Sequence, residues 1–199
     1  MKSEQAAEFY DNIFRTSEKY RLPPEEMLYY PMWCDVVARI GKGGAVIDLG
    51  CGPGQFGEVC ITNNITYVGI DFSSEAIEMA RINLGKHPFN DSWIFLHQNA
   101  FNLNDVKPTL TNSCGTLWTI TLLEICEHLT DDIGLIKEIP LHSPVYISVP
   151  NFDSESHVRF FPTMREVIDR YSKVIDITHS KEYPISKVNK IFLIGGKRK

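Results

Sequence analysis

A glycine-rich turn between two short apolar segments limits most strongly the folds that this chain can adopt. The first segment, 46–49, contains the acid Asp48 and runs into the sequence GCGPG at 50–54. The second segment, 67–70, is followed by another acid, Asp71. Strand, glycine turn, helix and strand in this order predict a β-α-β unit that holds a nucleoside, because an acid at the end of the second strand can accept hydrogen bonds from ribose hydroxyls.

Asp48 distinguishes this unit from an ordinary dinucleotide site. A pyrophosphate binds to backbone N–H groups at the positive end of a helix, and a carboxylate two residues before the first glycine would repel it. The alternative is a nicotinamide site built on the G-x-G-x-x-G spacing of Gly52, Gly54 and Gly57. Those glycines begin too far past the strand and leave Asp48 unexplained. The pattern therefore favours S-adenosylmethionine, a nucleoside with a sulfonium, an ammonium group and no phosphate.

The two motifs also resemble a known family. DLGCGPG at 48–54 and GIDFS at 69–73 are similar to the first two motifs of the class I S-adenosylmethionine-dependent methyltransferases. The resemblance implies an α/β fold with a Rossmann-like, seven-stranded, doubly wound sheet in a single domain, whose C-terminal strand is antiparallel to the rest. It also implies a set of cofactor-binding residues around the methionine, ribose and adenine of the cofactor. This set comprises Asp48, Gly50, Cys51, Gly52, Gly54, Asp71, Phe72, Asn99, Ala100, Thr121 and Leu122.

Short apolar segments alternate with helical patterns along most of the chain, which predicts a sheet covered by helices on both faces. The expected strands are 45–49, 66–70, 93–97, 115–121, 145–149, 174–178 and 190–194. The expected helices are 3–20, 55–63, 74–85, one from about 130, and one from 163 to about 171. A further helix is expected to start at 22–26, and Pro31 should kink or divide it before Trp33–Ile40. We expect residues 1–42 to form an N-terminal helical lid and residues 43–199 to form the methyltransferase core.

Two segments, 1–42 and 150–162, fall outside the alternating pattern at the expected binding edge. Both should lie over the carboxyl ends of the strands, where open α/β sheets bind their ligands. A lid this small favours a small-molecule substrate, or an accessible group on a larger one. An aromatic cluster near the cofactor edge, Tyr29, Tyr30, Met32 and Trp33, is interpreted as core or lid packing rather than as a stacking surface for substrate.

Composition narrows the partners and the compartment. A net charge of −5 argues against nucleic acid as a partner, since broad electrostatic capture needs a basic face. The five cysteines are odd in number and contain no C-x-x-C, which is typical of reduced thiols in the cytoplasm. The first residues contain no signal segment and no run is long enough for a membrane span, so we expect a cytoplasmic protein without a membrane partner. The sequence carries no signal for an oligomeric state.

A second motif follows the expected fourth strand. Glu124, Glu127 and His128 form an E-x-x-E-H pattern that resembles the ubiquinone-biosynthesis O-methyltransferases and the plant-type small-RNA 3′-end methyltransferases. In the latter, two glutamates and two histidines bind a divalent metal, and His157 is the candidate here for the fourth ligand. Carboxylates and imidazoles suit Mg²⁺ or Mn²⁺. Without a metal, the expected catalytic residues are Glu127, His128 and His157, with a histidine as the base that titrates near neutrality.

Together these features favour a cytoplasmic methyltransferase that methylates oxygen on a small molecule or a sugar-like group. Nitrogen and carbon acceptors use the same core, so the acceptor atom stays open. Two other functions also remain open: metal-assisted methylation of RNA ends, and a non-catalytic cofactor-binding subunit of a larger complex. Arg159 and Arg165 are read either as partners of an anionic substrate or as surface residues.

Overall fold

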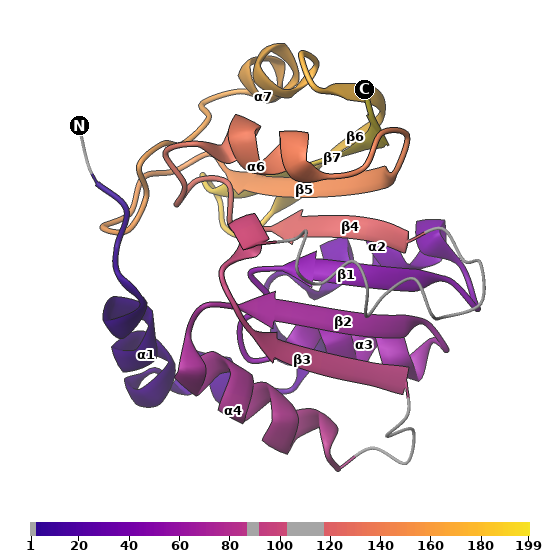
Figure 1. The fold of residues 1–199 in the computed structure, drawn as a ribbon. Helices are drawn as coiled ribbons and strands as arrows, with labels where there is room; N and C mark the ends of the chain where they lie inside the picture. Colours follow the sequence, from indigo (N-terminus) through magenta and orange to yellow (C-terminus); the bar gives the residue numbers. More distant parts are fainter. Residues whose placement is uncertain (1–2, 87–91, 103–117) are drawn as a thin grey trace.

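The computed structural model describes residues 3–86, 92–102 and 118–199. Its strands form one seven-stranded sheet in the order β3-β2-β1-β4-β5-β7-β6 (Figure 1). All neighbouring strands are parallel except β7, which is antiparallel to both β5 and β6. The strands are β1 Ala45–Leu49, β2 Thr66–Asp71, β3 Trp93–His97, β4 Trp118–Leu123, β5 Pro144–Pro150, β6 Ile175–Pro184 and β7 Lys190–Arg198. The predicted doubly wound sheet with an antiparallel C-terminal strand is confirmed.

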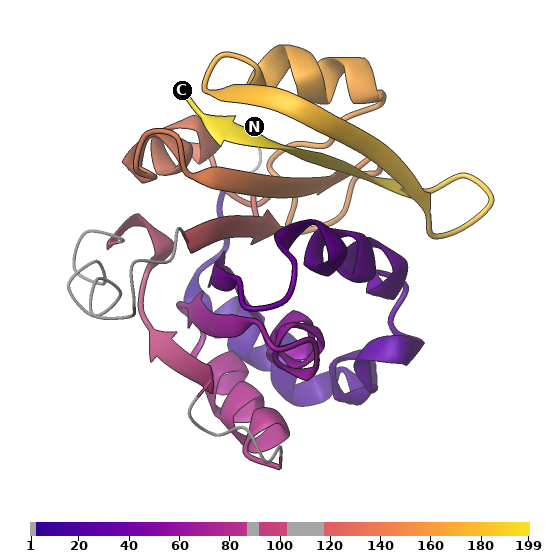
Figure 2. The ribbon, with the colours of Figure 1, turned by 90° about the vertical axis from the view of Figure 1, so that its right-hand side faces the viewer.

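The sheet is covered by helices on both faces (Figure 2). Side chains alternate between the two faces along each strand, so Val46 and Ile47 of β1 enter different cores. One core contains α2 (Tyr30–Ile40), α3 (Gln55–Thr62) and α4 (Ser74–Leu84), and the other contains α6 (Asp132–Glu138) and α7 (Met164–Tyr171). Strand order reverses between β1 and β4, which makes the carboxyl ends of these strands the expected ligand edge.

Short polar side chains set where the helices begin. The Ser73 hydroxyl accepts a hydrogen bond from the Ala76 N–H and caps α4. Asp131 caps α6 and Thr163 caps α7 in the same way. The predicted division at Pro31 is wrong, because α2 begins at Tyr30 and Pro31 lies in its first turn, where a missing N–H costs no hydrogen bond.

The largest differences from the predicted elements lie at the two ends of the chain. The N-terminal helix α1 spans only Ala7–Thr16, and two short 3₁₀ turns, Glu18–Arg21 and Pro24–Glu26, follow it. β6 and β7 both extend beyond their predicted ends. β6 is an edge strand with many exposed polar side chains, so its second half lacks the apolar pattern of a buried strand. Residues 115–117 of the predicted fourth strand, and Cys114, lie outside the described residues.

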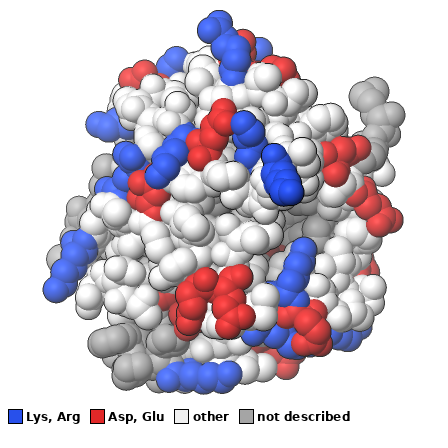
Figure 3. Space-filling model, turned by 180° about the vertical axis from the view of Figure 1, so that it is seen from behind, with Lys and Arg blue, Asp and Glu red and all other residues white. Residues whose placement is uncertain are grey.

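The molecular surface carries charges of both signs. On the face shown in Figure 3, Lys and Arg side chains are interspersed with Asp and Glu among uncharged residues.

In the part of the chain that the structure describes, no helix is both long and apolar enough to cross a membrane. Cys34, Cys51, Cys60 and Cys126 are free thiols. α1 lies beside the carboxyl ends of the strands and next to the start of α4 (Figure 1).

Candidate functional site

A cavity of about 410 Å³ opens at the carboxyl ends of the central strands. This volume falls in the range of ligand cavities, roughly 300–1,000 Å³. α1 and the loop after β5 both line it, so both segments expected to lie over the strand ends contribute residues there. Of the predicted site residues, the cavity is lined by Gly50, Cys51, Gly52, Asp71, Phe72, Asn99, Ala100, Glu124, Glu127, His128 and His157.

Two physical properties of the turn favour glycine: left-handed φ angles and a lack of space for a Cβ. Gly50 and Gly52 have φ angles of 74° and 51°, in the region that favours glycine, and both line the cavity. A Cβ on Gly50 would lie 2.6 Å from Cδ1 of Ile125, so the backbone there passes close to the next loop. Gly54 does not line the cavity, and a Cβ on it would lie 2.9 Å from the Phe95 ring. Gly54 also has a left-handed φ of 81°, so both its backbone conformation and the packing of the turn against the core favour glycine there.

Asp71 connects the end of β2 to the glycine turn. Its Oδ2 accepts a hydrogen bond from the Gly52 N–H at 2.9 Å, and its Oδ1 accepts one from the Ser73 N–H at 2.8 Å. Burial raises the pKa of the carboxyl, while the backbone N–H donors favour its charged form. Each carboxylate oxygen can accept more than one hydrogen bond, so capacity remains for hydroxyl groups in the cavity.

Asp48 lies beneath the turn and outside the cavity lining. It is 3% exposed, and it accepts hydrogen bonds from the Tyr67 hydroxyl and the Thr121 hydroxyl, both at 2.6 Å. Burial raises the pKa of Asp48 to about 7. Both oxygens thus have protein partners, and any interaction with a cation in the cavity would act across the turn. Thr121 and Leu122 are likewise buried within the sheet and absent from the lining.

Asn99, one of the predicted cofactor-binding residues, lies shortly after the end of β3. Its Oδ1 accepts a hydrogen bond from the Phe101 N–H at 3.0 Å at the start of a 3₁₀ turn, Ala100–Asn102. An amide oxygen has a second lone pair, so one acceptor position is left for a ligand. Asn99 and Ala100 both line the cavity.

Glu124 directly follows β4 in a strained backbone conformation. Its φ is 58°, a left-handed value that non-glycine residues adopt rarely and that concentrates at functional sites. Ser148 fixes this residue, because its hydroxyl accepts from the Glu124 N–H and donates to the Glu124 carboxylate, both at 2.9 Å. Burial raises the pKa of Glu124 to about 7. The strain therefore aims a carboxylate with a near-neutral pKa at the cavity.

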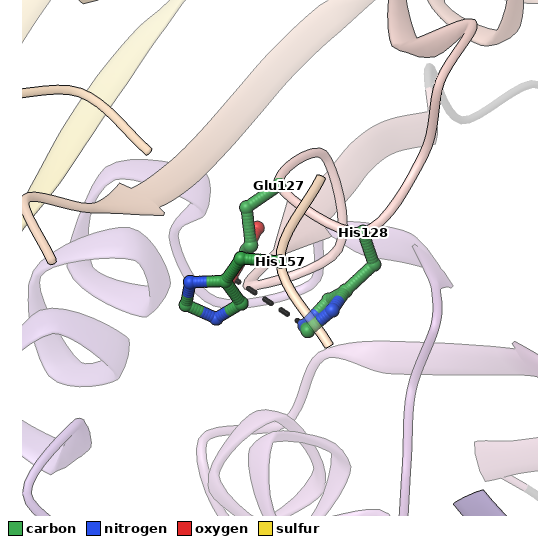
Figure 4. A group of neighbouring side chains, drawn as sticks. All are labelled: Glu127, His128 and His157. Carbon is green, nitrogen blue, oxygen red and sulfur yellow. Dashed lines mark ion pairs between the residues drawn. The ribbon is translucent and has the colours of Figure 1, made fainter. Parts of the chain in front are cut away.

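Glu127, His128 and His157 converge at the far end of the cavity (Figure 4). One ligand atom from each lies within 4.8 Å of the others, and Glu124 is outside this group. Nδ1 of His128 lies 3.0 Å from the Ser156 carbonyl, and Nδ1 of His157 lies 3.1 Å from the Phe152 carbonyl. Because carbonyls only accept, both Nδ1 atoms carry protons and both Nε2 atoms carry lone pairs.

Burial controls the charge of this cluster. It lowers the pKa of His128 to about 4, so the expectation that this histidine titrates near neutrality is wrong. Burial, together with the charge of Glu124, raises the pKa of Glu127 well above its ordinary value. Glu127 is 1% exposed, and its Oε2 has no hydrogen-bond partner among the described residues. A buried oxygen in this state is a ready acceptor for a ligand donor or a cation.

Arg159 holds the converging residues in place. Its guanidinium donates to the carbonyls of Cys126, Leu129 and Thr130, on both sides of the Glu127–His128 turn. It also lies 3.4 Å from Asp132, a fully buried carboxylate that Arg170 and Tyr171 bind as well. The sequence suggested that Arg159 either binds an anionic substrate or lies on the surface. Both interpretations are wrong, because its guanidinium binds backbone carbonyls and Asp132 inside the protein.

Sequence reasoning also missed Tyr10 of α1. Its ring lies 5.7 Å from the His128 ring and 5.4 Å from the Phe72 ring, measured between centroids, so it joins the two ends of the cavity. Burial raises the pKa of its hydroxyl. The only signal in the sequence was its place in the apolar stripe of the N-terminal helix. In the aromatic cluster, Tyr29 and Trp33 line the cavity, whereas Met32 is buried in the core.

The chain is similar to known methyltransferases. A family model described as a methyltransferase domain matches residues 40–138. A ubiquinone biosynthesis O-methyltransferase of Xanthomonas campestris pv. campestris (strain B100) is 27% identical over 103 residues, which is 51% of this chain and 40% of that protein. A protein of the same name from Vibrio parahaemolyticus is 25% identical over 95 residues, which is 48% of this chain and 37% of that protein. The chain thus matches well under half of the length of these relatives.

Solved structures share the whole fold. The 1,6-didemethyltoxoflavin-N1-methyltransferase of Burkholderia thailandensis, with bound 1,6-didemethyltoxoflavin and S-adenosylhomocysteine, has a TM-score of 0.66 at 13% identity and covers 100% of this chain and 93% of its own. The magnesium protoporphyrin IX methyltransferase of Synechocystis PCC 6803, with bound S-adenosylmethionine, has a TM-score of 0.66 at 12% identity over 100% of both chains. At these identities the likeness establishes the fold.

Proposed function

Because the chain belongs to the class I S-adenosylmethionine-dependent methyltransferases, we propose that it transfers the methyl group of S-adenosylmethionine to an oxygen of a small molecule or a sugar-like group. One observation carries the proposal. A single cavity joins the nucleoside end, at Asp71 and Phe72, to the buried cluster of Glu127, His128 and His157. A cofactor and an acceptor can therefore meet inside it.

In this proposal the cofactor lies over the glycine turn. Asp71 accepts from the ribose hydroxyls, Phe72 and Asn99 contact the adenine, and Gly50 and Gly52 let the backbone approach the methionine portion. Gly54, Thr121 and Leu122 shape the site from beneath, and Asp48 adds negative charge below the sulfonium. The support is geometric, since the first five of these residues line the same cavity.

The acceptor hydroxyl would lie beside the imidazoles. Methyl transfer is an in-line displacement, so the protein must align the nucleophile with the methyl carbon and exclude water. The Nε2 lone pairs of His128 and His157 can accept the hydroxyl proton, and Glu127 lies close enough to stabilise the resulting imidazolium, with Oε1 3.7 Å from Nε2 of His128. The low pKa of His128 means that it would hold this proton only transiently.

The helical segment 1–42 would act as the lid of this cavity. Glu4 accepts from the N–H and hydroxyl of Thr130, beside the acceptor end. Asp11 of α1 accepts from the Ser73 hydroxyl and the Glu75 N–H at the start of α4. α1 is thus tied to both sides of the cavity, which supports a lid role for the first part of the segment 1–42, whereas α2 at its end packs against the core 43–199.

A divalent cation is a second candidate at the acceptor end. The close grouping of Glu127, His128 and His157 favours it, as does the Glu127 Oε2 that lacks a partner among the described residues. One carboxylate and two imidazoles fit a cation such as Mn²⁺, with Glu124 nearby. A bound cation would polarise a hydroxyl group of the acceptor.

Transfer of a labelled methyl group from S-adenosylmethionine into a fractionated cell extract tests the proposal. Label in the small-molecule fraction, lost when His128 and His157 are both replaced by Ala, is the expected result. Label on RNA or protein would refute the small-molecule acceptor. Binding of S-adenosylmethionine without any transfer would instead support a non-catalytic subunit, and loss of transfer on adding a chelator would support the cation.

A further inference from the structure

The acceptor end of the cavity combines the buried carboxylate of Glu127 and the partly buried carboxylate of Glu124 with aromatic side chains. We propose that the acceptor substrate is a small hydroxylated amine whose ammonium group lies between the carboxylates of Glu124 and Glu127. This inference rests on the proposed function, because it names the substrate class for the same site. Three observations support it: a Glu127 oxygen without a hydrogen-bond partner among the described residues, the aromatic side chains that line the same cavity, and the charge of the cavity as a whole.

The oxygen is Oε2 of Glu127. It is buried, it belongs to a side chain that lines the cavity, and it has no hydrogen-bond partner among the described residues. Glu124 lies near enough for the two charges to act on each other, and Ser148 occupies one oxygen of Glu124. Burial raises the pKa of both carboxyls, and an ammonium group between them would favour their charged forms while supplying up to three donors.

The aromatic surface consists of Tyr29 and Trp33, at the amino end of α2. Their ring centroids lie 6.0 Å apart, and both side chains line the cavity. The side chains of Glu124 and Glu127 line the same cavity. Aromatic faces attract cations and also accommodate the apolar part of a ligand. A ring or short alkyl chain that carries an amine would contact both surfaces at once.

The cavity as a whole favours positive or neutral ligands. Among the described lining residues, the Asp, Glu, Lys and Arg side chains are Glu4, Asp71, Glu124, Glu127 and Lys19. The Lys19 ammonium lies 4.6 Å from the centroid of the Tyr20 ring, and Arg159 is engaged behind the Glu127–His128 turn. An acceptor that carries a carboxylate or a phosphate would meet acidic side chains without a matching cation, and would be repelled.

Three ring compounds of matched size test the charge preference. para-Hydroxybenzylamine, para-hydroxybenzyl alcohol and para-hydroxybenzoate carry the same hydroxyl and differ only in whether the second group is positive, neutral or negative. Binding of each is measured by calorimetry to the full chain saturated with S-adenosylhomocysteine, with a chelator present throughout. We expect the amine to bind at least tenfold more tightly than the alcohol, and the benzoate to bind more weakly than both.

Two variants localise the effect. Glu127→Gln and Glu124→Gln keep the side-chain shape and remove the charge, so each should reduce the preference for the amine at least tenfold. Glu182→Gln makes the same change on the exposed part of β6 and should leave the preference intact. The affinity for S-adenosylhomocysteine, measured on each variant, shows that the protein remains folded. Should one of the two cavity variants fail to fold, the other and the wild-type ranking still decide the result.

Several outcomes would overturn the inference. One is equal or tighter binding of the benzoate, and another is an amine preference that persists in both cavity variants. A third is binding of the alcohol or benzoate that appears only when Mg²⁺ or Mn²⁺ replaces the chelator, because the carboxylates would then form a metal site. The proposed function fails separately, through absence of S-adenosylhomocysteine binding in the first titration.

Discussion

Replacing Asp71 by Ala is expected to weaken S-adenosylmethionine binding and to destabilise the glycine turn at the same time. The Asp71 carboxylate accepts from the N–H groups of Gly52 and Ser73, and it also faces the cavity where the ribose would lie. The substitution therefore removes two internal hydrogen bonds in addition to the proposed contacts with the cofactor. Calorimetry measures the affinity, and chemical denaturation measures the free energy of unfolding.

The expected losses of folding stability and of cofactor affinity follow from different contacts of Asp71. An unsatisfied buried donor costs about 1–3 kcal/mol, but these two N–H groups border a cavity and can be hydrated in part. Removing Asp71 also relieves the cost of burying its charge, which raises its pKa in the folded protein. We expect the free energy of unfolding to fall by about 1–2 kcal/mol. Loss of the ribose contacts should weaken binding by about 1–3 kcal/mol, roughly 5-fold to 150-fold.

Asp131→Ala is the matched control. Asp131 also accepts from a backbone N–H, that of Gly134 at 2.9 Å, but it caps α6 and does not line the cavity. It should lose about 1 kcal/mol of stability and no affinity. Unchanged affinity in Asp71→Ala, or a loss no larger than in Asp131→Ala, would show that the carboxylate serves only the fold.

Three further changes test other parts of the site. Gly50→Ala should weaken cofactor binding at least about tenfold, since its Cβ would lie 2.6 Å from Ile125 at a φ of 74°. Gly43→Ala is the control, because Gly43 has a φ of 79° with open space around it, and this variant should keep normal affinity in calorimetry. Equal cofactor affinities of the two variants would contradict this prediction. Arg159→Ala should lower the free energy of unfolding by about 2–3 kcal/mol and reduce kcat at least about tenfold, with unchanged cofactor affinity. Arg159→Lys keeps the charge and should recover part of kcat. Normal turnover in Arg159→Ala would rule out a positioning role. The pKa of Glu124 is raised to about 7 in the folded protein, so the stability tied to its protonated form is lost as the pH rises from about 4.5 to 7. Glu124→Gln should therefore gain up to about 3 kcal/mol on the wild type between pH 5 and pH 8, and parallel denaturation curves at the two values would contradict this.

Local patterns predicted most of the sheet. β1, β2 and β5 are apolar runs, and the glycine turn after β1 needs φ values that glycine adopts readily. The caps at Ser73 and Thr163 were also readable, because each bonds within its own helix turn. The pattern failed at Pro31, which suits a first helical turn as well as it breaks an interior, and on the polar half of β6, where pairing with β7 rather than burial forms the strand.

The candidate site, like the sheet, was predicted only in part from the sequence. Sequence spacing identified Asp71, Glu127 and His128 because they follow strands whose carboxyl ends meet at one edge. It did not show that Asp48 lies beneath the turn, or that Gly54 packs against Phe95, since both depend on what the sheet buries. The same holds for the pKa of His128, which burial lowers to about 4.

By itself the sequence determined the β-α-β unit, the identity of the glycine turn and the residue types available for chemistry. Tertiary structure alone decided how those residues meet. His157 reaches Glu127 and His128 because the loop after β5 is hydrogen-bonded to the Glu127 carbonyl and because Arg159 binds the surrounding turn. Contacts between segments so distant in the chain leave no periodic pattern in the sequence, because they arise from long-range hydrogen bonds and burial that form only when the sheet is complete.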